Sequence, residues 1–259
     1  MEKRGQVTTF IIVGVVLLIV ILLALFLRED VFVGISKVKN TDIYLKSQMN
    51  EIINEVNKCV DLEANKALKT LGDQGGYFTP RNYISYYGYN IAYLCSEFKN
   101  EKTCRNNMLI EERLEDDLNL YLKDRLKKCI DLRSFKEGFK LHDYELNYDM
   151  GAFDLTTDIE KKNVRFVLFL PIELVSGDVN YKKDEFVKFV DIPFGEVIII
   201  VNDILNSEAS IGDFETTSYN IFRLGKYDLD KRRVYPDKVY TISVLGYNYR
   251  FQFAIEGAE

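Results

Sequence analysis

Residues 8–27 read TTFIIVGVVLLIVILLALFL, and this stretch decides how the rest of the chain is interpreted. It holds no charged residue, and its only hydroxyl groups are those of two threonines at its start. An α-helix rises about 1.5 Å per residue, so these residues would span about 30 Å, the thickness of the hydrocarbon core of a bilayer. A buried helix of a soluble protein is the alternative, but this stretch has no polar face. We therefore predict a transmembrane helix over residues 8–27, with the lipid bilayer as its partner.

The residues on either side of the apolar run indicate whether it is a cleaved signal peptide or a retained membrane span, and which way it crosses the membrane. A cleaved secretory signal usually has an apolar region of about 7–15 residues, followed by small residues at the cleavage site. Here the run is longer and ends in Phe26-Leu27-Arg28-Glu29-Asp30. Lys3 and Arg4 precede the span, and basic residues favour the cytoplasmic side. We expect a single-pass protein of the cell membrane with a cytoplasmic leader over residues 1–7 and the bulk of the chain outside.

The six residues from Lys3 to Thr8, KRGQVT, stand directly before the apolar run. This junction resembles the class III signal peptide of archaeal type IV pilins and archaellins. In that family a prepilin-type peptidase cuts after the glycine, and the helix anchors the subunit and can pack into a filament core. The resemblance implies processing between Gly5 and Gln6, with self-assembly or other surface proteins as partners. Pilins of this class commonly have Glu five residues into the mature chain, where this chain has Phe10.

A second, looser resemblance covers most of the remaining chain. It rests on three stretches, namely GDQGGY at residues 72–77, CID at residues 129–131 and YRFQFA at residues 249–254. Together they are similar to uncharacterised, surface-anchored, pilin-like proteins of small-genome archaea. This resemblance implies a location at the cell surface and no particular activity.

The composition excludes some functions and favours others. The chain of 259 residues has a formal net charge of -6, and an acidic protein disfavours nucleic acid, whose phosphates need a basic face. It has 17 Tyr, 17 Phe and no Trp. Aromatic residues favour strands or contact surfaces, so the tyrosines are expected in a sheet core or on a binding face.

The four cysteines are Cys59, Cys95, Cys104 and Cys129. Outside the cytoplasm, disulfides are the expected state, and four cysteines allow three pairings. Cys95 and Cys104 flank a polar loop, while Cys59 and Cys129 stand in similar contexts, NKCVDL and KKCIDL. We therefore favour Cys95–Cys104 with Cys59–Cys129. A zinc site is the rival, but the sequence has no CxxC pair and a single histidine, His142, so we expect no metal and no cofactor.

The region from residue 28 to 138 is predicted to be a helical stalk that carries a short hairpin. Apolar residues at helical spacing predict a helix from Thr41 to Leu71, which either continues from the membrane helix or breaks at Gly34. The Gln74-Gly75-Gly76 loop is read as a turn, since no Lys-Ser/Thr follows as in a phosphate-binding loop. Residues 83–94 predict two strands about a glycine turn, and residues 108–131 predict a second helix.

From residue 139 onward apolar residues recur at every second position, the spacing that is typical of β-strands. Residues 164–170, 185–192 and 249–255 are predicted to be strands. Residues 196–206 allow two interpretations: their β-branched run favours a strand, whereas Gly195 before them and Asn202-Asp203-Ile204-Leu205 near their end favour a helix packed on the sheet, which is the interpretation we prefer. The fold class is α+β: an N-terminal transmembrane helix, a helical stalk with disulfides, and a C-terminal antiparallel β-sheet domain over residues 139–259 with one packed helix.

The sequence shows no catalytic signature, so we expect no enzyme. His142 stands without a nucleophile motif, and pairs of carboxylates arise freely among 40 acidic residues. The predicted function is that of a membrane-anchored, type IV pilin-like surface protein, for adhesion, filament assembly or surface interaction. One alternative is an uncleaved single-pass protein with a partner-binding ectodomain. Another is an envelope hydrolase, which would need two carboxyl groups in one cleft.

Overall fold

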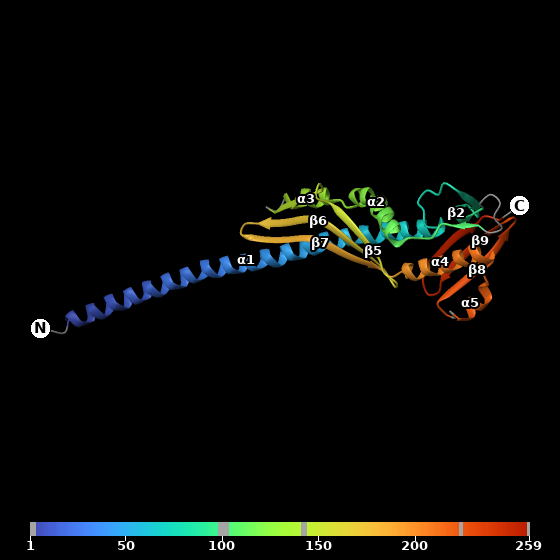
Figure 1. Cartoon of the computed structure of the whole chain (residues 1–259). Coiled ribbons are helices and arrows are strands. Elements are labelled where there is room, and N and C mark those ends of the chain that lie inside the picture. Colours follow the sequence, from blue (N-terminus) through green and yellow to red (C-terminus); the bar gives the residue numbers. More distant parts are fainter. Residues whose placement is uncertain (1–3, 98–103, 141–143, 223–224, 258–259) are drawn as a thin grey trace.

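The computed structural model describes residues 4–97, 104–140, 144–222 and 225–257, without the side chains of residues 4–13, 22–40 and 140. A long helix projects from an elongated head, and the two ends of the chain lie at opposite ends of the molecule (Figure 1). The head combines helices with two β-sheets and contains two disulfides. The α+β class is therefore confirmed.

Helix α1 runs without a break from Arg4 to Asp73, over 70 residues. It contains no proline, and Gly34, which the sequence left as a possible break, is helical. A glycine inside a helix costs only about 1 kcal/mol relative to alanine, and the hydrogen bonds on either side outweigh that cost. From residue 41 onward one stripe of α1 is buried in the head: Leu45, Met49, Ile52, Val56, Cys59, Val60, Ala64, Ala67, Leu68 and Leu71. The helix predicted from Thr41 to Leu71 is confirmed as the second half of α1.

The first sheet is antiparallel and lies beside the middle of α1 (Figure 1). Its strands are β4 (Glu145–Tyr148), β5 (Asp154–Ile159), β6 (Val164–Ser176) and β7 (Val179–Val190). Strand β6 is central, with β7 along one side and both β5 and β4 along the other. Every second residue of β6 from Val164 to Leu174 is buried, as the period of two predicted.

The second sheet lies at the far end of the head and has the order β1-β2-β10-β9-β8, with β3 paired to β2. Its strands are β1 (Tyr83–Tyr86), β2 (Tyr89–Ser96), β3 (Arg105–Asn106), β8 (Tyr227–Val234), β9 (Asp237–Val244) and β10 (Tyr249–Ile255). The predicted hairpin of residues 83–94 is confirmed as β1 and β2, but β2 also pairs in parallel with β10. The expectation of a purely antiparallel sheet is therefore wrong for this pair, and β1, β2 and β3 belong to the same sheet as the C-terminal strands.

The described residues of the head form four further helices: α2 (Glu111–Cys129), α3 (Leu132–Lys140), α4 (Phe194–Ile211) and α5 (Thr216–Phe222). Helix α2 buries a leucine at every fourth position, Leu114, Leu118, Leu122 and Leu126. Helix α4 was expected on the sheet despite its β-branched run, and Phe194 at its start packs on Tyr249 and Phe251 of β10. Both predicted helices are confirmed.

The end of α1 packs closely against β10, directly before the glycine-rich loop. Gly75 and Gly76 both adopt positive φ, which glycine alone adopts without strain, so the loop is the turn that the sequence predicted. At Gly72 an added Cβ would collide with the backbone oxygen of Arg250. Beside it the Asp73 carboxylate accepts a 2.9 Å hydrogen bond from Nε of Arg250. The GDQGGY and YRFQFA stretches, far apart in sequence, thus form one junction.

The close approach of Gly72 to β10 predicts that a methyl group added at this position lowers the stability of the protein. Gly72→Ala should lower the free energy of unfolding by about 1–3 kcal/mol, because the backbone of β10 has to move away. Gly138→Ala in α3 is the matched control, since an added Cβ there meets no atom within 4 Å, and it should leave stability unchanged or slightly raised. Urea unfolding of the two variants tests the junction, and equal stability would contradict it.

Candidate functional site

The projecting part of α1 carries an apolar surface that the head leaves uncovered. Seven consecutive large apolar residues, Val15 to Ile21, are each between 50% and 60% exposed. They point in all directions around the helix axis, and this part of α1 extends away from both sheets (Figure 1). Single exposed apolar residues are common on soluble proteins, but a continuous apolar surface of this kind marks a contact site.

This surface falls inside the predicted membrane span of residues 8–27. Within the part of the chain whose side chains are described, no helix is long and apolar enough to cross a membrane. Only residues 14–21 of the predicted span belong to that part. The processing site expected at Gly5 and Gln6 lies outside the described side chains, as does His142.

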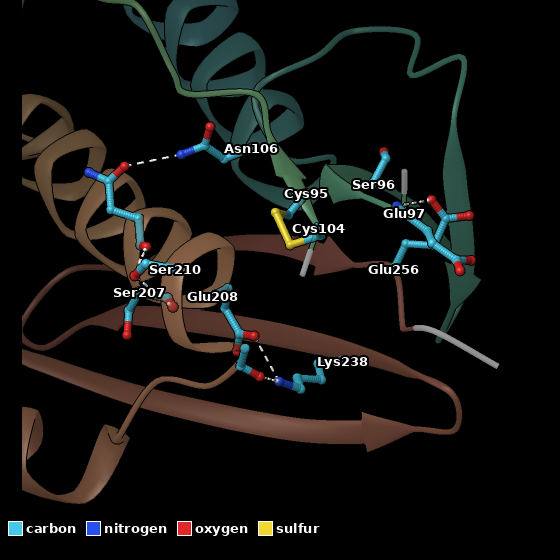
Figure 2. The surroundings of a disulfide bond; sticks show 12 residues. Cys95, Ser96, Glu97, Cys104, Asn106, Ser207, Glu208, Ser210, Lys238 and Glu256 are labelled. Atoms are coloured by element: carbon cyan, nitrogen blue, oxygen red, sulfur yellow. Dashed lines mark hydrogen bonds and ion pairs between the residues drawn. A yellow bond between two sulfur atoms is a disulfide. The ribbon is translucent and has the colours of Figure 1, made fainter. Parts of the chain in front are cut away.

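The two disulfides join elements that frame the head. Cys59 of α1 is bonded to Cys129 at the end of α2, and Cys95 of β2 is bonded to Cys104, directly before β3. Figure 2 shows the second bond beside α4, where the Asn106 side chain donates a hydrogen bond to Asn206. This is the pairing that the sequence favoured. No cluster of metal-binding side chains is found among the described residues.

A groove of about 540 Å³ lies where the chain leaves α1. It is formed by the loop after α1, strand β2, the residue after β3 and the first turns of α2. We call it the arginine groove and define it by six of its lining residues: Tyr77, Arg81, Asn82, Tyr93, Asn107 and Arg113. Its volume is within the range of about 300–1,000 Å³ that is usual for small-molecule sites.

Hydrogen bonds hold the two aromatic walls of the arginine groove in place. The Asn107 amide donates to the Tyr77 hydroxyl at 2.8 Å, and the Arg113 guanidinium lies 4.5 Å from the centre of the Tyr77 ring. On the other wall the Tyr93 hydroxyl donates to Asp237 at 2.7 Å. Burial, and after it this hydrogen bond, raises the pKa of Tyr93 above its usual value, so the phenol stays protonated. Both rings are therefore fixed before any ligand arrives.

The charges of the arginine groove are only partly neutralised within it. Arg113 is paired with Asp117, one helical turn later, at 2.9 Å. Arg81 is exposed and has no ion-pair partner among the described residues. The groove thus combines one paired and one unpaired guanidinium on a protein whose net charge is negative.

The sequence left open whether the tyrosines lie in a sheet core or on a binding face, and the structure has both buried and exposed tyrosines. Tyr240 and Tyr249 are buried in the second sheet, whereas Tyr83, Tyr87 and Tyr235 are exposed on its hairpins. The arginine groove itself was not predicted. Arg81 follows Pro80 in a loop and Arg113 stands in a charged run, and neither pattern signals that folding brings them to one groove.

Comparison of the chain with protein families, with curated proteins and with solved structures gives no match.

The disulfides lead to a prediction that depends on loop length. The Cys59–Cys129 bond closes a loop with a sequence separation of 70, and the Cys95–Cys104 bond closes one of 9. Because a longer loop loses more chain entropy on closure, the first bond should contribute about 4 kcal/mol and the second about 2.5 kcal/mol. Double Cys→Ala variants at each pair, unfolded in urea, measure both contributions. A larger loss for the Cys95/Cys104 variant than for the Cys59/Cys129 variant would contradict this order.

Proposed function

We propose that the chain is a non-enzymatic, membrane-anchored surface protein of type IV pilin-like design, which displays its disulfide-bonded head outside the cell for adhesion, assembly or surface interaction. The observation that carries this proposal is the uncovered apolar surface from Val15 to Ile21 on the projecting half of α1. Exposing that surface to water is unfavourable by about 25 cal/mol per Å² of apolar area. A bilayer would remove it from water along its whole circumference.

The continuity of α1 supports the pilin-like part of the proposal. In the family that the KRGQVT junction resembles, one N-terminal helix both anchors the subunit and enters its head. Here the same helix carries the exposed apolar residues and the buried stripe that begins at Leu45. Processing by a prepilin-type peptidase between Gly5 and Gln6, and packing of α1 from several copies in a filament, belong to this proposal.

An uncleaved single-pass protein is the second candidate function. It is favoured by Phe10, which stands where the family commonly has a glutamate. In this version α1 stays in the bilayer and the head binds a partner at the cell surface, with no filament. Both versions place the head outside the membrane.

Anchoring predicts how the chain behaves in membrane extraction. The wild-type chain should remain in the membrane pellet after washing with alkaline carbonate. The double variant Leu17→Asp/Ile21→Asp should move to the soluble fraction or fail to insert, because each charge at the centre of a span costs about 2.5–3.5 kcal/mol. Leu120→Asp/Ile211→Asp, which changes two exposed apolar residues of the head, is the control and should stay in the pellet. A wild-type chain that carbonate releases would exclude the anchor.

The two versions differ in the N-terminus of the mature protein. Mass spectrometry of the chain purified from its native membrane should find Gln6 as the first residue if the pilin route is followed. An intact Met1 would exclude processing and leave the uncleaved version. Electron microscopy of labelled cell surfaces then tests assembly, and label spread evenly over the membrane without fibres would exclude filaments.

A further inference from the structure

The arginine groove has an unbalanced positive charge. Asp117 neutralises Arg113 through their ion pair at 2.9 Å, which leaves the exposed Arg81 without an ion-pair partner among the described residues. A guanidinium binds a planar carboxylate through two parallel hydrogen bonds, and such charge-assisted bonds are about twice as strong as neutral ones. A ligand with a carboxylate group would thus be held at Arg81.

The remaining polar groups of the arginine groove suit a ligand rich in hydroxyl groups. The amide nitrogens of Asn82 and Asn107 already donate, to Ser96 and Tyr77 respectively, so their carbonyl oxygens remain as acceptors. Ser96 accepts the bond from Asn82, and its own proton remains available to donate. A sugar hydroxyl donates and accepts at once, and can therefore pair with both kinds of group.

The Asp117 carboxylate further restricts the class of ligand that fits the arginine groove. It lines the same groove but is balanced by Arg113 at 2.9 Å, so it leaves one unbalanced positive charge, that of Arg81, which matches a single carboxylate better than the many charges of a polyphosphate or a nucleic acid. It would accept hydrogen bonds from hydroxyl groups. The ligand that fits has local negative charge and neutral hydroxyl groups between the charges.

The walls of the arginine groove can pack against a sugar ring. Tyr77 and Tyr93 are partly buried and present aromatic surface to the groove, whereas Pro80 and Ala92 are buried. Both tyrosines are fixed by hydrogen bonds, to Asn107 and Asp237 respectively, so binding would immobilise few additional side chains. A prearranged site loses less entropy on binding.

From these observations we infer that the arginine groove binds an acidic saccharide, a short glycan with carboxylate groups. Arg81 holds a carboxylate, the oxygens of Asn82 and Asn107 accept from hydroxyl groups, and the tyrosine rings contact the apolar faces of the sugar. This goes beyond the proposed function, because it names what the displayed head binds. It does not depend on the anchor, and failure of either proposal leaves the other standing.

The test is calorimetric titration of the full chain in detergent micelles. The probes are a galacturonic acid trimer, the same trimer as its methyl ester, and a hyaluronan tetrasaccharide. The two acidic probes should bind, and methyl esterification should weaken binding about tenfold or more, because it removes the charge that Arg81 pairs with. Arg81→Gln should weaken binding of the acid trimer by a similar factor.

The matched control is Arg233→Gln, which removes an exposed arginine of β8 outside the groove and should bind the trimer like the wild type. Three results would overturn the inference: no binding of either acidic probe, equal binding of the acid and its ester, or undiminished binding by Arg81→Gln. Displacement of the trimer by an equal concentration of inorganic phosphate would also overturn it, since the groove would then be a general anion site. The carbonate extraction of Arg81→Gln should match that of the wild type, which separates the groove from the anchor.

Discussion

The head depends on one buried stripe along the second half of α1. This stripe packs against β6 and β7 of the first sheet, β10 of the second sheet, and α2. Neither sheet is large, and each would expose apolar surface if α1 were removed, since a sheet with an apolar face has to bury it against another element. Gly72, next to the last residue of the stripe, lies directly against the backbone of β10, where an added Cβ would collide with the Arg250 oxygen. The missing side chain at Gly72 lets the helix approach β10 closely, and the Cys59–Cys129 bond holds α2 against the same helix.

The same stripe holds the end of α1 in the head, and the arginine groove is built beside that end of the helix. Loop residues that line the groove follow α1 directly, so the groove sits at the end of the helix and not on its side. From residue 28 to residue 73 a straight helix extends about 70 Å. Under the proposed anchoring, that length holds the groove well clear of the membrane surface. A continuous helix with no proline is suited to this role, because its position does not depend on a linker.

Local patterns in the sequence predicted the helices and strands, whereas contacts between distant residues determine how the strands pair and where the arginine groove forms. The leucine period of α2 and the alternation of β6 are properties of neighbouring residues, so both could be predicted. The hairpin of β1 and β2 was also predicted, because its glycine turn stands between two short apolar runs. The parallel pairing of β2 with β10 could not, since it joins residues about Tyr93 to residues about Ala254. The loop after α1, strand β2, the residue after β3 and the first turns of α2 build the arginine groove, and nothing in any one of them signals the others.

The arginines near the end of α1 differ in whether their guanidinium groups already make contacts within the chain. Arg250 is exposed in part, yet its guanidinium is paired with Asp73 and lies 4.9 Å from the centre of the Tyr89 ring. Arg113 is likewise engaged, by Asp117 and by the Tyr77 ring. Both arginines stabilise the junction or the groove wall, and a ligand would have to compete with those contacts. Arg81 has no such contact among the described residues, so its charge is the one that the fold leaves for a partner.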